Sequence, residues 1–395
     1  MMELGQRSAM ILGEGGDDGW GIYYRARDLI RAGERVVNLT IGEPDVKTDP
    51  AIFDAMRAAA AAGHSGYTVG PGLEPLRRAI AARVERMTGV PTAMENVIVT
   101  PGGQAALFAA HMVTLDPGQA GLYCAPFYPT YPGTIRATGA RAIEVPTRSS
   151  EDFQPRAAAI LQAAAEAQGA RTLLINTPNN PTGVLYTPET MAAVAGAVRE
   201  AGLWLISDEV YDGQVWSGRH LSARALPGMA ERTLVIGSFS KSFAMTGSRI
   251  GWMVGPAAAI EAAGVLATAT TYGIPPFIQM GALHALSLGE GFEAAVADPF
   301  RRRRDIAARV LGNAAAVRLI PAEGAMYVML DIRATGLSGA EFAARLLEAE
   351  RIAVMPGESF GAPSAGHVRV ALTVADEDLA GALERLAGFA AGLAR

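Results

Sequence analysis

The residues with the clearest potential for chemistry follow a short apolar run at 233–237. They are Ser238-Phe239-Ser240-Lys241, with Arg249 eight residues beyond the lysine. A lysine at the end of a strand can be partly desolvated, which lowers the pKa of its amine and frees it to form a Schiff base with a carbonyl. Ser238 offers a hydroxyl and Arg249 a planar charged fork, and both suit a phosphate. Because most lysines in loops carry no function, the prediction depends on the residues that accompany this one.

Two other polar segments follow predicted strands, at 176–183 and 207–211. They read Asn-Thr-Pro-Asn-Asn-Pro-Thr-Gly and Ser-Asp-Glu-Val-Tyr. The carboxylate of Asp208 could pair with a protonated pyridine nitrogen, while an asparagine amide and a tyrosine hydroxyl could hydrogen-bond a phenolic oxygen of the same ring. Each segment also has a plain structural interpretation, because Asn-Pro-Thr-Gly is typical of turns and Asp208 alone could cap a helix.

A glycine turn joins a predicted strand at 97–100 to the start of a helix. Its residues Gly102-Gly103-Gln104 would aim free backbone N–H groups at an anion, and paired glycines let a phosphate approach closely. A purely structural turn explains the same pattern. The segment lacks the lysine of a P-loop and the spaced glycines of dinucleotide folds, and Gly13-Glu14-Gly15-Gly16 follows no strand, so nucleotide binding has little support.

The elements that must position these residues alternate between short β-rich runs and Ala/Leu-rich helices, which indicates crossover units on a mostly parallel sheet. The predicted strands are Val97 to Thr100, Gly121 to Cys124, Leu173 to Asn176, Trp204 to Ser207 and Thr233 to Gly237. Ligands of open α/β sheets bind beyond the carboxyl ends of such strands.

Near residue 285 the pattern changes to a long helix followed by alternating strands, which we interpret as a second, α+β domain. The strands expected there are Met326 to Leu330, Ile352 to Met355 and Val368 to Leu372. The helix predicted at Tyr23 to Ala32 should pack with this domain, because about 40 residues cannot bury a core alone.

Length and composition exclude several classes of protein. A chain of 395 residues that is 50% hydrophobic and 18% charged, with a mean hydropathy of +0.19, should fold compactly as two packed domains. A net charge of −5 gives no reason to expect nucleic-acid binding, and the one basic block, Arg301 to Arg304, reads as a solvated helix face. A single cysteine, Cys124, excludes an internal disulfide, and the five histidines show no metal-ligand spacing. With no signal peptide and no long apolar run, we expect a cytoplasmic protein without a membrane partner.

The motifs occur together and in a fixed order over nearly the whole chain. They are Gly42-Glu43-Pro44-Asp45, Gly102-Gly103-Gln104, Asn179-Asn180-Pro181-Thr182-Gly183, Asp208-Glu209-Val210-Tyr211, Ser238 to Lys241 with Arg249, and His367-Val368-Arg369-Val370-Ala371-Leu372. This ordered set resembles the class I/II aminotransferases, which are fold type I pyridoxal-phosphate enzymes. The resemblance implies an α/β fold with a large domain at 48–285, built on a mostly parallel seven-stranded sheet between helices, and a smaller α+β domain formed by 1–47 and 286–395.

The resemblance also implies a role for each matching residue. Lys241 resembles the lysine that binds the cofactor pyridoxal 5'-phosphate, and Asp208 the partner of its pyridine nitrogen. Asn180 and Tyr211 match the groups that bind the phenolic oxygen. The phosphate positions are Gly102, Gly103, Gln104, Ser238 and Arg249; Tyr128 matches the aromatic residue stacked on the ring; Tyr67 resembles the tyrosine that reaches the neighbouring subunit's phosphate; and Gly42, Asn180 and Arg369 fall at substrate positions, with Arg369 on the α-carboxylate.

The activity implied by the resemblance is transamination by a homodimer. The amino group of an L-amino acid would pass to a 2-oxo acid, pyruvate or 2-oxoglutarate, by a ping-pong mechanism through aldimine and ketimine intermediates. Lys241 would act as the general base, Asp208 would keep the ring protonated, and Tyr211 completes the catalytic set.

Specificity for the donor is read from the segment Thr270 to Pro276, which often supplies a cation for a distal carboxylate in this family. Here it contains no arginine or lysine, so a dedicated aspartate site is not favoured. The runs at 272–279, 301–305 and 330–338 are similar to an arginine:pyruvate transaminase subgroup. A basic donor would need a carboxylate, and the candidates are Glu14, Asp17 and Asp18, which otherwise read as solvated loop acids.

Three other functions remain as alternatives. A C–S β-lyase on the same scaffold is poorly separated from a transaminase by sequence. A non-catalytic, pyridoxal-phosphate-sensing regulator would need a DNA-binding helix-turn-helix, and residues 1–40 are too short to hold one with a linker. A nucleotide-dependent dehydrogenase lacks its glycine fingerprint.

Overall fold

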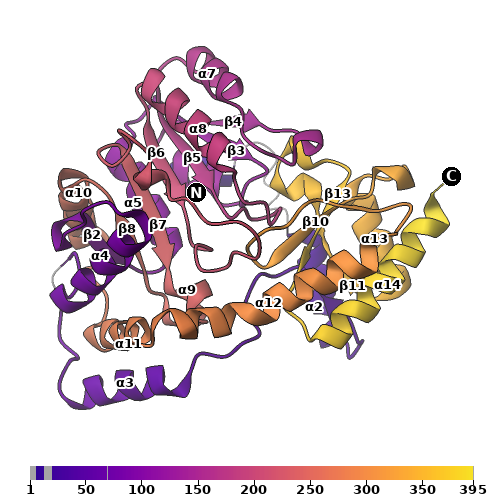
Figure 1. Cartoon of the computed structure of the whole chain (residues 1–395), viewed down its shortest axis with the longest axis horizontal. Coiled ribbons are helices and arrows are strands. Elements are labelled where there is room, and N and C mark those ends of the chain that lie inside the picture. The colour runs from indigo at the N-terminus through magenta and orange to yellow at the C-terminus, as the bar shows by residue number, and fades with distance from the viewer. Residues whose placement is uncertain (1–5, 13–19, 69, 395) are drawn as a thin grey trace, which may run out of the picture.

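A seven-stranded sheet forms the centre of the molecule (Figure 1). The computed structural model describes residues 6–12, 20–68 and 70–394. The strand order is β2(Val97–Thr100), β8(Gly251–Val254), β7(Thr233–Ser238), β6(Trp204–Asp208), β5(Ala170–Asn176), β3(Ala120–Ala125) and β4(Arg141–Pro146). Strands β7, β6, β5, β3 and β4 run parallel, and β8 is antiparallel to both its neighbours. The predicted mostly parallel, seven-stranded sheet is confirmed.

Helices cover both faces of this sheet, because successive strand residues point to opposite sides. Leu174, Leu234 and Ile236 pack against one helical layer, whereas Leu173 and Val235 face the other. The first layer contains α5(Gly103–Thr114), α6(Tyr131–Arg136) and α10(Ala257–Thr270); the second contains α4(Glu74–Thr88), α7(Ala157–Glu166), α8(Pro188–Glu200) and α11(Pro276–Ser287), with α3(Pro50–Ala61) packed on α11. Burial on both faces explains why these strands read as unbroken apolar runs in the sequence.

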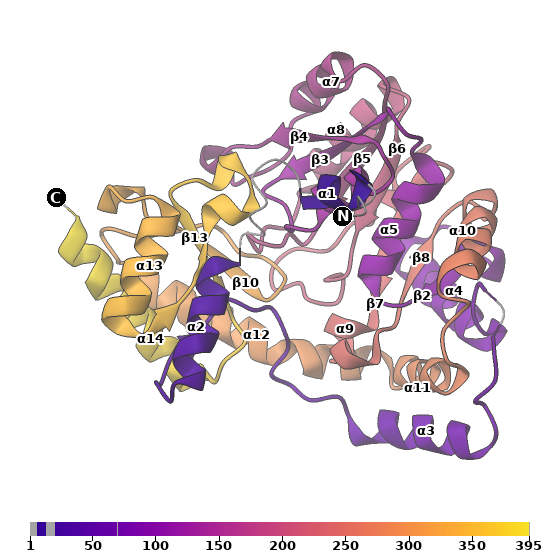
Figure 2. The same ribbon diagram turned by 180° about the vertical axis from the view of Figure 1, so that it is seen from behind.

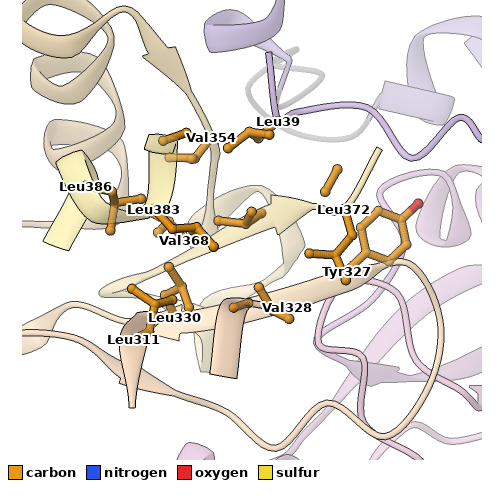
Figure 3. Packing of buried hydrophobic residues seen from close by; sticks show 14 of the residues in the cluster. Leu39, Leu311, Tyr327, Val328, Leu330, Val354, Val368, Leu372, Leu383 and Leu386 are labelled. Atoms are coloured by element: carbon orange, nitrogen blue, oxygen red, sulfur yellow. The ribbon is translucent and has the colours of Figure 1, made fainter. Parts of the chain in front are cut away.

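A smaller antiparallel sheet, with strand order β12(Met355–Pro356), β13(His367–Ala371), β10(Tyr327–Asp331) and β9(Arg318–Leu319), lies beside the first. A separate parallel pair joins β1(Val37–Asn38) to β11(Ile352–Ala353). Leu330 and Val368 of the small sheet pack with Leu383 and Leu386 in a second core (Figure 3). The helices around it are α2(Gly21–Arg31), α12(Gly289–Leu311), α13(Gly339–Glu350) and α14(Asp376–Leu393).

Most predicted elements are confirmed, including the helix at 23–32, which corresponds to α2. Its residues Ala26 and Leu29 pack against Leu347 and Ala353 of the smaller region. The single strand predicted at Ile352 to Met355 is wrong, because β11 and β12 pair with different partners on either side of Val354. The short helix α1(Gln6–Leu12), which is labelled in Figure 2, lies against α6. Arg136 of α6 donates to the Ile11 carbonyl at 3.0 Å.

The basic block at 301–304 is not a solvated face throughout. Arg303 is buried, and its guanidinium pairs with Asp45 at 2.7 Å and with Asp376 at 2.9 Å. Arg301 and Arg302 are about half exposed and bind Asp298. A run of like charges on one helix therefore splits between solvent and core, because consecutive residues of a helix point in different directions.

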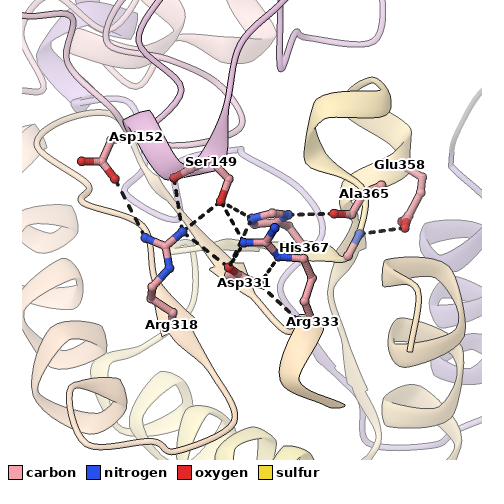
Figure 4. Close-up of polar contacts among 9 residues, drawn as sticks. Ser149, Asp152, Arg318, Asp331, Arg333, Glu358, Ala365 and His367 are labelled. Carbon is pink, nitrogen blue, oxygen red and sulfur yellow. Dashed lines mark hydrogen bonds and ion pairs between the residues drawn. The ribbon is translucent and has the colours of Figure 1, made fainter. Parts of the chain in front are cut away.

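A polar cluster connects the two sheets on the side of β10 and β13 (Figure 4). Ser149, in the 3-10 turn η2(Ser149–Glu151) after β4, lies 3.0 Å from His367 Nε2 and accepts a hydrogen bond of 2.9 Å from Arg318. Asp331 pairs with Arg333 at 2.6 Å in the same cluster. These bonds hold the edge of the large sheet against the small one.

No helix in the described ranges is both long and apolar enough to cross a membrane. Cys124 is buried in β3 as a free thiol, and burial raises its pKa to about 12. Within the same residues, no three His, Cys, Asp or Glu side chains gather as metal ligands.

Candidate active site

A cavity of about 330 Å³ opens where β5, β6 and β7 end and α5 begins. Its position is the one expected for ligands of a parallel sheet. The structure brings most of the predicted site residues together on its wall: Gly42, Gly103, Gln104, Tyr128, Asn180, Asp208, Tyr211, Ser238, Lys241, Arg249 and Arg369. Gly102 lies directly behind the wall, against Arg249.

One end of the cavity is a cradle for an anion. The first turn of α5 has N–H groups without intrahelical partners, and its residues Gly103 and Gln104 line the cavity. Gly102 has φ +83°, and a Cβ atom there would lie 2.4 Å from Arg249 Nη2, so only glycine fits. Arg249 is itself held by a 2.7 Å bond to the Thr246 carbonyl, and Ser238 caps the short helix α9(Phe239–Ser242) beside it.

Asp208 lies fully buried at the end of β6. Its Oδ2 atom accepts a 2.6 Å hydrogen bond from Tyr131, and Oδ1 accepts one of 3.3 Å from the Val210 N–H. Burial raises the pKa of Asp208 to about 6, although both hydrogen bonds act in the opposite direction. A carboxylate in such a position is ready for a positively charged partner supplied by a ligand.

Hydrogen bonds of the Asn176 side chain hold the asparagine segment after β5 in place. Asn176 donates to the Asp208 carbonyl at 2.9 Å and accepts from the Asn180 N–H at 2.7 Å. The Asn180 side chain is thereby turned toward the cavity, where its oxygen accepts a 2.9 Å bond from Arg369. Tyr211 points its hydroxyl to the hydroxyl of Tyr327, 3.1 Å away.

Lys241, in α9, places its amine 2.6 Å from the Gly42 carbonyl oxygen, to which it donates. Burial lowers the pKa of the Lys241 amine, and the charges of Arg369 and Arg249 lower it further, against the opposing influence of Tyr327 and Glu43. A larger neutral fraction of the amine makes it a better nucleophile toward a carbonyl.

Arg369 is fully buried on β13 and has no carboxylate partner among the described residues. One guanidinium nitrogen binds Asn180 and another donates to the Thr40 carbonyl, while Nε has no partner in the described part of the chain. The rings of Tyr327 and Phe360 flank the group at 4.5 and 4.7 Å. Because burial of an unpaired charge is costly, the arrangement points to a carboxylate brought by a ligand.

Two aromatic residues from the sequence prediction occupy different places. Tyr128 lines the cavity and makes an edge contact with Tyr131 at 5.9 Å. Tyr67 does not line the cavity; it is 90% exposed and touches Tyr272 edge-on at 5.1 Å. Glu14, Asp17 and Asp18 lie outside the described residues.

Sequence reasoning missed Tyr131, Tyr327 and the internal role of Asn176. Tyr131 is close in sequence to Tyr128, and Asn176 belongs to a segment already selected, so spacing alone could have suggested both. Tyr327 lies in a strand whose apolar pattern indicated only a core position.

The residues present fit pyridoxal phosphate. The glycine cradle with Arg249 suits its phosphate, the buried carboxylate of Asp208 suits its ring nitrogen, and the amine of Lys241 suits its aldehyde. This set, on the carboxyl edge of a mostly parallel sheet, defines an α/β enzyme of the fold type I pyridoxal-phosphate class.

Comparison with known proteins gives the family. The sequence profile of "Aminotransferase class I and II" matches residues 34–386. The chain therefore belongs to the class I and II aminotransferases. It is a pyridoxal-phosphate-dependent transaminase that acts on amino acids and 2-oxo acids.

Individual relatives cover almost the whole chain. The arginine–pyruvate transaminase of Pseudomonas aeruginosa is 40% identical over 374 residues, which are 95% of each chain. The aspartate/prephenate aminotransferase of Thermus thermophilus is 36% identical over 92% of this chain and 93% of its own. The solved structure of the Thermus thermophilus aspartate aminotransferase with maleate superposes with a TM-score of 0.90 at 33% identity, covering 98% of this chain and 100% of the other.

The buried position of Asp208 predicts how the stability of the cofactor-free protein depends on pH. The pKa of Asp208 is about 6 in the folded state and about 4 in an unfolded chain. Between about pH 4 and about pH 6 the folded state therefore keeps a proton on Asp208 that the unfolded state has lost. Relative to Asp208→Asn, the wild-type protein should therefore lose roughly 2 to 3 kcal/mol of unfolding free energy as pH rises from about 4 to about 6. Thermal unfolding of both proteins across this range measures the difference.

Tyr131→Phe provides the matched variant for this experiment. The Tyr131 hydrogen bond lowers the pKa of Asp208, so its removal should raise that pKa in the folded state. The fall in stability should then begin at the same pH but continue to higher pH and become larger. Parallel pH curves for wild type and Asp208→Asn would contradict the assignment.

Proposed function

We propose that the enzyme transfers the amino group of a non-acidic L-amino acid, with arginine as the leading candidate, to pyruvate or 2-oxoglutarate. The observation that carries the proposal is the charge on the cavity wall. Among the described lining residues the cations are Lys241, Arg249 and Arg369, and each has a task at the cofactor or at the α-carboxylate. No cation remains there for the second carboxylate of an acidic donor.

The name of one relative supports the same direction, since the Pseudomonas aeruginosa protein is an arginine–pyruvate transaminase. Other relatives are named for aspartate and prephenate, so kinship alone leaves the donor open. The segment Thr270 to Pro276 adds no cation to this chain. Glu14, Asp17 and Asp18 stay our candidates for a carboxylate that would face a basic side chain.

The site residues have two kinds of role in this proposal: some bind the substrate, and others hold or transfer protons. Bound pyridoxal phosphate supplies an electron sink for the bond between Cα and its hydrogen. Arg369 holds the α-carboxylate by a bidentate pair, which fixes the Cα–H direction. The Lys241 amine would move the proton at Cα, and Asp208 would hold a proton on the ring nitrogen.

A lyase on the same scaffold is the competing function, and a panel of donors separates the two. With pyruvate or 2-oxoglutarate present, arginine and other non-acidic amino acids should give amino-group exchange without ammonia, and aspartate should react at least tenfold more slowly, because a buried unpaired carboxylate costs more than about 1.4 kcal/mol. Product analysis of each mixture measures the outcome. Ammonia released without an acceptor would favour the C–S β-lyase, and aspartate as the best donor would contradict the donor proposal.

Lys241→Ala tests the assigned base. The variant should retain the fold, because the lysine side chain makes one hydrogen bond, to the Gly42 carbonyl. It should lose turnover by at least a thousandfold, since both the covalent link and the proton carrier are removed. Borohydride treatment of the cofactor-loaded wild type, followed by peptide mass analysis, should locate the cofactor on Lys241. Normal turnover of the variant would refute the role.

We also propose that the active unit is a homodimer in which Tyr67 reaches the partner's phosphate site. Three large apolar side chains are exposed, as is typical of a surface that another copy covers: Tyr67, Val265 and Tyr272, with exposed fractions of 90%, 70% and 57%.

We propose that the chain is divided into a large domain, 48–285, and a smaller domain formed by 1–47 and 286–395. The seven-stranded sheet lies within 97–254, and the smaller sheets use strands outside this range. The free, buried Cys124 fits a cytoplasmic location.

Hybrid dimers test the position of Tyr67. Lys241→Ala and Tyr67→Ala chains, co-expressed with different tags, should form a dimer in which one site has both its own Lys241 and the partner-supplied tyrosine. The purified hybrid should exceed the mean activity of the two parent dimers severalfold, because only the hybrid contains a complete site. A hybrid no more active than that mean would show that Tyr67 serves its own subunit.

A further inference from the structure

Tyr327 lies at the point where the groups assigned to cofactor and substrate meet. It begins β10, opposite Ala371 in the small sheet, and it lines the cavity although it is almost completely buried. Its hydroxyl lies 3.1 Å from the hydroxyl of Tyr211 and 3.5 Å from Asn180 Nδ2, and its ring lies 4.5 Å from the centre of the Arg369 guanidinium.

The hydrogen bonds form a chain with one consistent direction. Arg369 donates to Asn180 Oδ1, and the amide nitrogen of Asn180 donates to the Tyr327 oxygen. Tyr327 has a single hydroxyl hydrogen, which it can then give to the oxygen of Tyr211. With its acceptor position filled in this way, Tyr211 keeps its own hydrogen for a group inside the cavity.

The backbone around Tyr327 has been shaped to admit its hydroxyl. A Cβ atom at Gly42 would lie 1.6 Å from the Tyr327 oxygen, so the close approach requires glycine. The carbonyl of the same Gly42 accepts the bond from Lys241. The tyrosine and the lysine therefore contact one short stretch of backbone, and a shift of Tyr327 would move the acceptor of the amine.

We propose that Tyr327 is a positioning residue with two separable functions. Its hydroxyl orients Tyr211 as a hydrogen donor into the cavity, and its ring sets the plane of the Arg369 guanidinium. The inference rests on the proposed roles of Tyr211 and Arg369, and Tyr327 itself needs no bond to the substrate.

The two functions separate in two variants. Tyr327→Phe keeps the ring and removes the hydroxyl, and Tyr327→Leu removes both. Tyr186→Phe is the control, because Tyr186 is a buried tyrosine in another core cluster, away from the cavity wall. The readouts are the pH midpoint of the visible absorption of the bound cofactor, kcat and KM for the amino acid, and Tm of the cofactor-free protein.

For Tyr327→Phe we expect the pH midpoint of the cofactor absorption to rise by about one unit. Without the Tyr327 hydroxyl, Tyr211 donates a weaker hydrogen bond, which stabilises the deprotonated form of the bound cofactor less. The kcat of this variant should fall about tenfold, with KM changed less than about twofold. Tyr327→Leu should in addition raise KM about tenfold for donors of every side-chain type, because no ring at position 327 would then orient the plane of the Arg369 guanidinium. The Tyr186→Phe control should leave midpoint and KM at wild-type values.

A lower Tm with unchanged midpoint, kcat and KM in Tyr327→Phe would overturn the proposal, because the hydroxyl would then be structural only. Equal KM values for Tyr327→Leu and Tyr327→Phe would overturn the function of the ring. Other measurements test the proposed function on which this inference rests. A wild-type protein without a visible cofactor band, or full turnover in Lys241→Ala, would overturn the proposed function and the inference together.

Discussion

The candidate site depends on two buried charges, those of Asp208 and Arg369, that have no ion pair with the described residues. Two other buried arginines are neutralised by carboxylates of the chain: Arg83 pairs with Asp212 and Glu293, and Arg303 with Asp45 and Asp376. A third, Arg224, donates to the carbonyls of Ala230 and Pro91. Asp208 and Arg369 are as deeply buried, yet among the described residues neither has an ion pair of its own. Since an uncompensated buried charge destabilises a fold, its persistence at the carboxyl edge of the sheet marks the site that ligands complete.

The fold places these charges by bringing two sheets to one cavity. The large sheet contributes residues at the carboxyl ends of its parallel strands, among them Asp208, while the small antiparallel sheet contributes Arg369 and Tyr327. The chain at Thr40 and Gly42 passes between them, and its carbonyls bind Arg369 and Lys241. The geometry of the site thus depends on the contact between the sheets, which the cluster around Ser149 and His367 helps to fix (Figure 4).

The sequence was a good guide to elements with a simple environment and a poor one to contacts set by tertiary packing. Five strands with buried apolar residues were recognised, whereas the edge strand β4, with its polar Arg141 and Glu144, was not. The four-residue strand β8 was also missed, although it is buried on both faces between β2 and β7. The predicted lysine, acid and arginine meet because each follows or lies on a strand. Tyr131 and Tyr327 reach partners 77 and 147 residues away, and an aromatic residue in an apolar run looks like any core residue until the fold brings them together.

Burial shifts the pKa values of the two titrating groups of the cavity in opposite directions. One apolar environment thus favours the neutral form of both the acid and the amine. It raises the pKa of Asp208 and lowers that of Lys241, so each is moved toward its neutral form. A neutral amine is the nucleophile that an aldehyde requires, and a carboxyl that resists ionisation gains most when a protonated ring nitrogen arrives. Ligand binding then supplies the missing charge, and its free energy adds to the stability of the folded state. The electrostatic cost of burying these groups and the affinity of the site for its cofactor are thus two results of the same burial.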